Sequence, residues 1–258
     1  MSNKKKTIGF VTARTCSTRL PKKCLLPFGE STVLNHIIQR AVSYDIEPIV
    51  CTSTSNEDDI IVEIANKEGV KFYRGSLVNK LKRWLDCAEY FNIDMFHTID
   101  ADDPFFDGDL MIQSIELLRS GYDLIYPTIS SHSGAATVGF SVSAEIVEES
   151  CKGLDSSMDT EVMWPLIEKV SGIKKNTLPE KDKNPYVARL TLDYEEDYWL
   201  LKSIERICGA LASRDSIDAF LIKNPDFYKI NWFRNSQWKE NQELKEQQIA
   251  NNDHTFSD

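Results

Sequence analysis

The sequence predicts one α/β domain, built on a mostly parallel, mixed sheet with helices on both faces. Two observations lead to this fold class. From residue 8 to residue 126, short apolar segments alternate with longer segments whose apolar residues recur at helical spacing. This alternation is typical of βαβ units, whose connecting helices cover both faces of a parallel sheet. The chain of 258 residues, with 41% hydrophobic content, is also long and apolar enough for one substantial core.

The first half of the chain contains most of the expected strands. Short apolar runs predict strands at 8–12, 48–52, 70–73, 95–99 and 123–126. Helical patterns fill the intervals, at 33–42, 55–69, 77–91 and 107–120. Ser31 is the predicted N-cap of the first helix, and Ser55 with Asp58 forms the predicted capping box of the second.

The second half is less regular between residues 129 and 190. We expect a Ser/Gly-rich loop at 130–137, a strand near 138–142, a helix at 160–170 and an exposed turn at 174–185. Regular pattern returns with a strand followed by a helix in 187–207. Residues 1–233 are therefore assigned to one domain. The polar tail 234–258 is expected to be a solvated helix or disordered, and no function is assigned to it.

Composition and charge narrow the class of protein. Forty acidic residues against thirty basic ones give a net charge of −10, which argues against nucleic acid or an anionic membrane as a general partner. The sequence has neither an apolar run of membrane-spanning length nor a signal-peptide pattern. Its six cysteines are scattered without a CxxC pair, so we expect reduced thiols in a cytoplasmic protein and no structural zinc site.

A basic loop follows the first predicted strand, at residues 13–30 (ARTCSTRLPKKCLLPFGE). It contains the cations Arg14, Arg19, Lys22 and Lys23, against the acidic background of the chain. Neither GxxxxGK[ST] nor GxGxxG is present, so the two commonest phosphate-binding loops are excluded. Two interpretations remain: a solvated loop, or a triphosphate clamp in which arginine supplies forked donors and lysine a point charge.

Acidic residues end two other predicted strands. Asp100, Asp102 and Asp103 crowd into DADDPFFD, and such crowding favours a bound cation such as Mg²⁺. The alternative is that these residues mark the beginning of the helix at 107–120. Asp193, in RLTLDYEED, is either the N-cap of the next helix or a second metal ligand, because both strand ends are expected at one edge of the sheet.

Together these segments resemble a known family. ARTCSTRLPKKCLLPFGESTVLNHII is similar to the ARxxSxRLPGKxLxxxxGxPxLxHxI signature of the cytidylyltransferases that make CMP-activated acidic sugars. The likeness is strongest to the branch typified by the spore-coat polysaccharide cytidylyltransferase, and weaker to the enzyme that activates 3-deoxy-manno-octulosonate. YRGSLVNKL, TIDADDPFFDGDLM, RLTLDYEEDYWLLKSI and IKNPDFYKIN resemble that branch's FRGSxDDVL, xTADxPLxDPxLI, RLTVDxPEDLxLIxxI and xxNPELxxIN. The resemblance covers residues 7–231 and implies a nucleotide-diphospho-sugar transferase-like (Rossmann-like) fold with a mixed, seven-stranded type of sheet.

The resemblance also implies roles for individual residues. The residues implied to be catalytic are Arg14, Arg19 and Lys23, which would hold the triphosphate, and Asp102 and Asp193, which would hold Mg²⁺. Contacts to the nucleotide are implied for Ala13, Ser17, Ser76 and Asp100. Weaker candidates for acceptor binding are Arg74, Arg189 and Glu161. Arg189 has an alternative interpretation, as a surface-facing strand position.

The sequence departs from the family pattern at several points. Lys22 replaces a glycine, Asn79 and Lys80 replace Asp-Val, and Gly139 stands where a glutamate is frequent. TEVMWP at 160–165 replaces a segment like REHVTP, so that Val162 and its neighbours lack the arginine and histidine. Most of these changes fall where acceptor recognition is expected, which indicates an uncommon acceptor.

The function implied by the resemblance is transfer of CMP from CTP to an acidic, ulosonic acid-like sugar, with release of pyrophosphate, for surface polysaccharide or glycoconjugate biosynthesis. Two alternatives stay open: a nucleotidyltransferase acting on a sugar phosphate or phosphonate, and an inactive nucleotide-binding homologue. The region 129–165 resembles the part through which such enzymes dimerise. It contains Val138, Phe140 and Trp164, apolar residues expected to be exposed, so we predict a homodimer.

Overall fold

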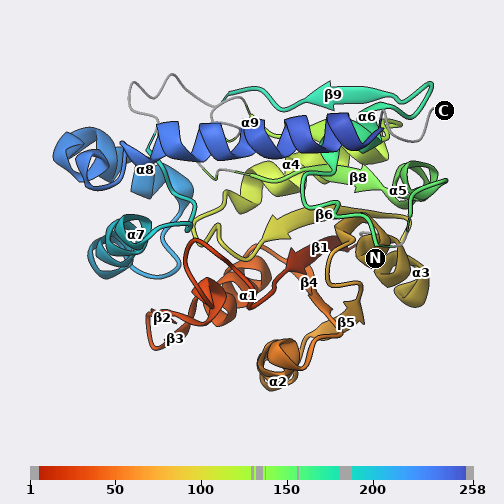
Figure 1. The fold of residues 1–258 in the computed structure, drawn as a ribbon. Helices are drawn as coiled ribbons and strands as arrows, with labels where there is room; N and C mark the ends of the chain where they lie inside the picture. The colour runs from red at the N-terminus through yellow and green to blue at the C-terminus, as the bar shows by residue number, and fades with distance from the viewer. Residues whose placement is uncertain are drawn as a thin grey trace.

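The computed structural model describes residues 6–128, 131, 136, 138–155, 157–180 and 188–253. Seven strands form one sheet in the order β5-β4-β1-β6-β8-β7-β9 (Figure 1). Their bounds are β1 Thr7–Thr12, β4 Ile46–Ser53, β5 Lys71–Gly75, β6 Met95–Asp100, β7 Leu124–Tyr126, β8 Ser141–Ser143 and β9 Lys175–Thr177. A separate two-stranded hairpin joins β2 (Pro27–Phe28) to β3 (Ser31–Thr32) within the basic loop region.

The strand directions confirm the predicted mostly parallel, mixed sheet. β1 is parallel to β4 on one side and to β6 on the other, and β4 is parallel to β5. β8 is antiparallel to both of its neighbours, β6 and β7, while β7 and β9 are parallel. Because β1 and β6 are adjacent and parallel, the basic loop after β1 and the acidic segment after β6 leave the sheet at the same edge.

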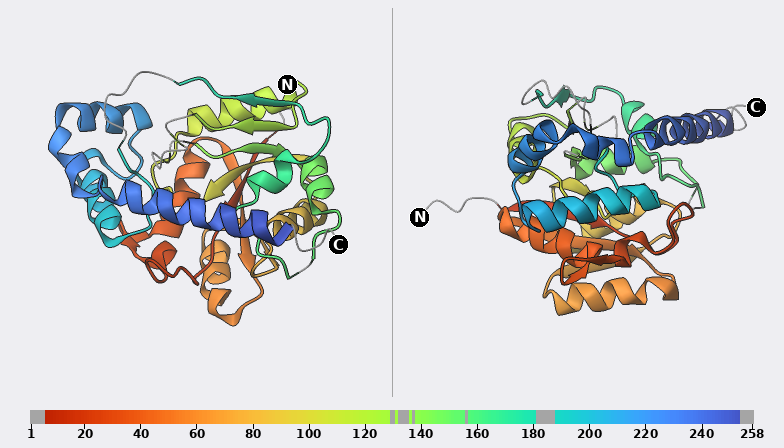
Figure 2. Two further views of the ribbon diagram at one scale, coloured as in Figure 1. Left: turned by 45° about the horizontal axis from the view of Figure 1, so that its top comes forward. Right: turned by 90° about the vertical axis from the view of Figure 1, so that its left-hand side faces the viewer.

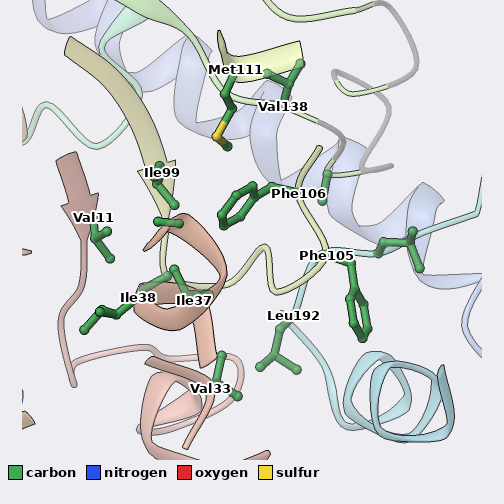
Figure 3. Packing of buried hydrophobic residues seen from close by; sticks show 14 of the residues in the cluster. Val11, Val33, Ile37, Ile38, Ile99, Phe105, Phe106, Met111, Val138 and Leu192 are labelled. Carbon is green, nitrogen blue, oxygen red and sulfur yellow. The ribbon is translucent and has the colours of Figure 1, made fainter. Parts of the chain in front are cut away.

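Helices cover both faces of the sheet (Figure 2). They are α1 Val33–Ser43, α2 Asp59–Lys67, α3 Lys80–Phe91, α4 Gly108–Arg119, α5 Ala144–Cys151, α6 Trp164–Glu168, α7 Glu195–Cys208, α8 Arg214–Lys223 and α9 Arg234–Asp253. The side chains of successive strand residues point to opposite faces. Val11 therefore belongs to the core beneath α1 and α4 (Figure 3), whereas its neighbour Phe10 packs with α3 and α5 on the other face.

Two predicted helix starts are wrong. Ser31 lies in β3, and the N-cap of α1 is Thr32, whose hydroxyl accepts a hydrogen bond from the backbone of Asn35. Ser55 caps only the short 3-10 turn Asn56–Asp58, and the carboxylate of Asp58 turns inward to the basic loop instead of completing a capping box. Tertiary contacts have overridden the local capping pattern at both positions.

The second half departs further from the predicted elements. Residues 188–194 join no strand of the described sheet and bend at several positions. Leu190 and Leu192 are buried in the core, and the amide of Leu192 donates to the carbonyl of Asp102. The strand β9 lies inside the segment expected to be an exposed turn, and the helix expected at 160–170 shortens to α6. Much of the expected loops at 130–137 and 174–185 lies outside the described residues.

The polar tail forms α9, a 20-residue helix that crosses the molecule in front of the sheet (Figure 1). Its few apolar residues are scattered among polar ones, which is why the sequence showed no apolar stripe. Among the described helices, none has both the length and the apolar character needed to span a membrane.

Candidate active site

Two cavities, each of about 420 Å³, lie beside the carboxyl ends of β1 and β6. We call the first the loop cavity, because its wall includes Ala13, Arg14 and residues 16–19 of the basic loop. We call the second the aromatic cavity, because Phe140, Met163, Trp164 and Trp238 line it. The two share Arg19, Lys23, Lys80, Asp100, Asp102 and Glu161. We call these residues, together with the adjoining Asp103 and Asp193 of the aromatic cavity, the charged wall. A ligand in one cavity would therefore meet a ligand in the other at this wall.

The basic loop is held in place by a buried carboxylate. Asp58 accepts hydrogen bonds from the backbone amide and the hydroxyl of Thr15, both at 2.8 Å, and from the hydroxyl of Ser53. Burial by itself would raise the pKa of Asp58, but these hydrogen bonds outweigh it and lower the pKa. The start of the loop is thus fixed to the end of β4, so that Arg14 and Arg19 are presented from an ordered backbone.

The backbone conformation at Lys22 bears on one departure from the family pattern. Its backbone lies in the left-handed region, with φ 54° and ψ 31°, immediately before the 3-10 turn Lys23–Leu25. A glycine adopts this conformation freely, whereas a residue with a Cβ atom is strained by about 1–2 kcal/mol. The family's glycine at this position therefore answers a backbone requirement, and Lys22 meets the same requirement at some cost in stability.

The charged wall is a network of cations and carboxylates. The ammonium of Lys23 donates to Asp102 and, at 2.8 Å, to Asp193. Arg19 donates to the same oxygen of Asp193 at 2.6 Å, and Arg189 donates to its other oxygen at 3.1 Å. Segments more than 160 positions apart in the sequence therefore meet around one carboxylate.

The charges in this network shift one another's pKa values. Burial by itself would lower the pKa of Lys23, but the carboxylates of Asp102 and Asp193 outweigh it and raise the pKa above its usual value. Burial would raise the pKa of Asp193, but Lys23, Arg19 and Arg189 together hold it well below its usual range. Both groups are consequently charged at neutral pH.

The interpretation of Asp193 as a helix N-cap is wrong. Its side chain faces the cations, and the start of α7 is capped from within the helix by Asp197, which accepts from the backbone amides of Asp193 and Tyr194. Arg189 is likewise not a surface-facing strand residue. It is buried, and its guanidinium lies between Asp193 and Asp197.

The carboxylates of the wall fit a divalent cation. Oxygen atoms of Asp100, Asp102 and Asp103 lie within 4.8 Å of one another. Burial, the charge of Asp193 and that of Asp100 raise the pKa of Asp102 in spite of Lys23. Burial and the charges of Asp102 and Asp100 raise the pKa of Asp103 well above its usual value. A site that concentrates so much negative charge favours a cation, and Asp102 and Asp193 already converge on the ammonium of Lys23.

Two cationic residues that were not among the predicted site residues, Lys80 and Arg83, also line the loop cavity. Lys80, at the first turn of α3, donates to Asp100 at 3.0 Å and forms part of the shared wall. Arg83, one turn on, is fully buried; among the described residues its Nε and Nη2 have no hydrogen-bond partner. Lys80 was visible in the sequence as a departure from the family pattern, and that departure was the available signal.

Of the other residues predicted for the site, some line the loop cavity and some lie outside both cavities. Ala13, Arg14 and Ser17 line the loop cavity, and Arg14 also pairs with Glu161 at 3.4 Å. Arg74 and Ser76 line neither cavity. Arg74 is bound instead to Asp59 and to two backbone carbonyls, and the Ser76 hydroxyl accepts from the amide of Asn79.

The remaining departures have local structural causes. Asn79 is the N-cap of α3, accepting from the amide of Lys82 at 2.8 Å. Gly139 lines the aromatic cavity at a close approach of two chain segments, where a Cβ atom would lie 2.1 Å from the carbonyl oxygen of Thr98. The glutamate that is frequent in the family is therefore incompatible with this backbone. Val162 lines the same cavity.

The apolar residues of the 138–164 region are not the exposed face that was predicted. Val138 is buried in the core, at 4% exposure. Phe140 and Trp164 stack on each other, with ring centroids 3.4 Å apart, and both line the aromatic cavity. These side chains thus form one wall of a ligand-sized cavity in the single chain.

Comparison with known proteins gives consistent results. The model of the cytidylyltransferase family matches residues 8–148, more than half of the chain. An uncharacterized protein of Methanocaldococcus jannaschii is 30% identical over 88% of this chain and 94% of its own length. The spore coat polysaccharide biosynthesis protein SpsF of Bacillus subtilis is 26% identical over 84% and 94%. The structure of a cytidylyltransferase from Leptospira borgpetersenii superposes with a TM-score of 0.74 and 26% identity, over 86% of this chain and 96% of that one.

Proposed function

Because the chain belongs to the cytidylyltransferase family, whose members are CTP-dependent nucleotidyltransferases, we propose that it transfers CMP from CTP to an acidic, ulosonic acid-like sugar and releases pyrophosphate. The observation that carries the proposal is the pair of cavities that meet at one charged wall. A transferase that joins two substrates needs two adjoining pockets, with its electrostatic groups at the junction.

The loop cavity is assigned to CTP. Arg14, Arg19 and Lys23 line it, together with Lys80 and Arg83, so it concentrates positive charge in an otherwise acidic protein. Guanidinium groups bind phosphate through forked donors, and ammonium groups bind it as point charges. The α-phosphate belongs at the shared wall, because only there is it within reach of an acceptor in the second cavity.

The aromatic cavity is assigned to the acceptor. Its aromatic wall of Phe140 and Trp164 suits the apolar face of a sugar ring, and Lys80 at its charged end suits a carboxylate. In the transfer, a hydroxyl oxygen of the acceptor attacks the α-phosphorus of CTP. The bond from that phosphorus to the bridging oxygen breaks, pyrophosphate leaves with the electron pair, and the acceptor loses its hydroxyl proton.

The metal in this proposal is Mg²⁺, held by Asp102 and Asp193, with Asp100 and Asp103 beside them. When bound, Mg²⁺ neutralises charge on the triphosphate and helps to orient it. The chain's own cations do the rest of the work. Lys23 and Arg19, which pair with these carboxylates in the free protein, turn to the phosphate oxygens and stabilise the charge that builds up on the departing pyrophosphate.

The biological setting is also part of the proposal. We assign the enzyme to the cytoplasm, where CTP is available, and to surface polysaccharide or glycoconjugate biosynthesis, the process that the name of the Bacillus relative supports. The homodimer stays a prediction, because all three residues on which it was based line the aromatic cavity and Val138 is also buried. Light scattering at micromolar protein concentration tests it: a mass near 29.5 kDa would contradict a dimer.

The deciding experiment measures pyrophosphate release with CTP and Mg²⁺ against a panel of 2-keto-3-deoxy sugar acids, sugar phosphates and phosphonates. We expect release with at least one sugar acid, and tighter binding of CTP than of ATP, GTP or UTP in calorimetry. Arg19→Gln should abolish release. The matched control is Lys71→Gln, a cation outside both cavities that pairs with Glu47. Turnover with a sugar phosphate and none with any acid would replace the proposed acceptor, and preference for another nucleotide would contradict the assignment of CTP.

A further inference from the structure

The C-terminal helix α9 is anchored directly above the candidate active site. Arg234 forms two hydrogen bonds with the carboxylate of Glu196, at 2.8 and 3.0 Å, and its guanidinium lies 4.7 Å from the centre of the Tyr194 ring. Asn241 donates to the hydroxyl of Tyr194 at 3.3 Å, and the Trp238 ring lies 5.8 Å from the guanidinium of Arg189.

The three anchoring residues of α9 share one face of the helix, because 234, 238 and 241 are spaced i, i+4, i+7. Their partners lie in the segment 189–196, which also carries Asp193. The anchors therefore tie the helix to the same stretch of chain that supplies the central carboxylate of the charged wall.

Two of the anchors, with residues beside them, line both cavities. Trp238, Lys239 and Glu243 line the aromatic cavity, whereas Asn241 and Leu244 line the loop cavity. Trp238 and Asn241 belong to the anchoring face itself, whereas Lys239 and Leu244, five positions apart, lie about 140° apart around the helix axis, on opposite sides of that face. One helix thus contributes a wall to each of two adjoining cavities.

We propose that α9 is a substrate-binding element, which closes the nucleotide site with one face and the acceptor site with another. This inference rests on the proposed function. The sequence pattern assigned no function to these residues, since a helix without an apolar stripe shows no pattern of burial.

The helix depends on its anchors and on bound substrate for its place. A polar helix gains little stability from its own hydrogen bonds in water, so its position must come from tertiary contacts. The described anchoring contacts are those of Arg234, Trp238 and Asn241, and the C-terminal end of the helix extends past the other elements in the side view (Figure 2). Bound CTP and acceptor add partners for Lys239, Asn241 and Leu244, and the closed helix excludes water from the α-phosphorus.

The test compares two truncated chains with the full chain. Ending the chain after Phe233 removes α9, whereas ending it after Gln247 keeps every cavity-lining residue of the helix and serves as the matched control. With CTP and Mg²⁺ as ligand, we expect the first truncation to raise the Kd for CTP and the KM for the acceptor about tenfold each. The control should stay within about twofold of the full chain, and circular dichroism and thermal unfolding verify that both chains fold.

Point variants separate the two faces. Leu244→Ala should raise the Kd for CTP by roughly threefold with the acceptor KM unchanged, and Lys239→Ala should do the reverse. A helix that merely stabilises the fold would move both constants equally or neither, so a uniform effect overturns the proposal. Unchanged constants in a folded chain that ends at Phe233 overturn it as well.

Proteolysis gives a measurement that needs no acceptor. Trypsin cleaves after Lys239, and CTP with Mg²⁺ should slow this cleavage about tenfold in the full chain. Cleavage at an unchanged rate in a chain that binds CTP by calorimetry overturns the role of α9 alone. A full chain that neither binds CTP nor releases pyrophosphate overturns the proposed function and this inference together.

Discussion

Replacing Asp193 with asparagine tests the centre of the charged wall. The side chain of Asp193 is only 4% exposed and accepts hydrogen bonds from Lys23, Arg19 and Arg189. The substituted amide would keep the size of the side chain but remove the charge, and would leave these cations under-compensated in a largely buried site. Breaking a buried ion pair in this way costs about 3–5 kcal/mol. We expect the lower end, about 3 kcal/mol, because Arg189 keeps Asp197 and Lys23 keeps Asp102.

Two assays measure this effect. For a chain of this size, about 3 kcal/mol corresponds to a fall in Tm of roughly 6–12 °C. Turnover should drop by roughly 10³ or more, since several kcal/mol of transition-state stabilisation are lost and each ~1.4 kcal/mol is tenfold. The matched control is Asp226→Asn, an exposed carboxylate paired with Lys229, which should change stability by less than about 0.5 kcal/mol.

The contribution of Asp193 to the stability of the protein should depend on pH. The folded pKa of Asp193 is lowered, so its stabilisation is present above the unfolded pKa of about 4 and is lost as the pH falls towards the folded value. The difference in stability between the wild-type protein and Asp193→Asn should therefore stay constant from about pH 7 to pH 5 and shrink as the pH falls from about 5 to 3. A variant with wild-type stability at neutral pH and near-normal pyrophosphate release at saturating Mg²⁺ would refute this account of the site.

Three other predictions concern positions explained by the structure. Gly139→Ala should destabilise the protein by about 3 kcal/mol in urea unfolding, because its Cβ atom would meet the Thr98 carbonyl oxygen at 2.1 Å; a loss below about 1 kcal/mol would contradict the close approach. Lys22→Gly should be more stable than Lys22→Ala by about 1 kcal/mol, since φ is 54° there, and equal stabilities would argue against a left-handed backbone. Burial lowers the pKa of His36 to about 4 and of His97 to about 3, so each histidine takes up a proton on unfolding below about pH 6.5. The free energy of unfolding should therefore fall by about 2 kcal/mol per histidine from about pH 7 to pH 5. Histidine NMR signals that titrate near about 6.5 in the folded protein would contradict this prediction.

The alternating pattern of the first half was sufficient to predict the sheet. A strand in a buried parallel sheet is a short apolar run, and a covering helix shows an apolar stripe, so both signals are local. The predicted runs at 8–12, 48–52, 70–73 and 95–99 correspond to β1, β4, β5 and β6. Clustered charges also identified the basic loop at 13–30 and the acidic segment at 100–107, because each concentrates charge of one sign in a short stretch.

Local pattern failed where partners distant in the sequence decide the structure. The segment 188–192 has the alternating pattern of a strand, yet it packs Leu190 and Leu192 into the core without joining the described sheet, in which β6 has β1 and β8 as its neighbours. Asp58 has the spacing of a capping residue, yet its carboxylate is drawn to Thr15. Both outcomes depend on which neighbour offers the better burial or hydrogen bond, and spacing along the chain does not encode that choice.

The sequence by itself determined the fold class and the chemical character of the site, since alternation and clustered charge are properties of the chain as written. Only the tertiary structure decided how the charges are paired, with Lys23 between Asp102 and Asp193 and with Lys80 and Arg83 added to the loop cavity. It alone also brought α9 over both cavities, because a helix without an apolar stripe is positioned by a few specific contacts, here those of Arg234, Trp238 and Asn241.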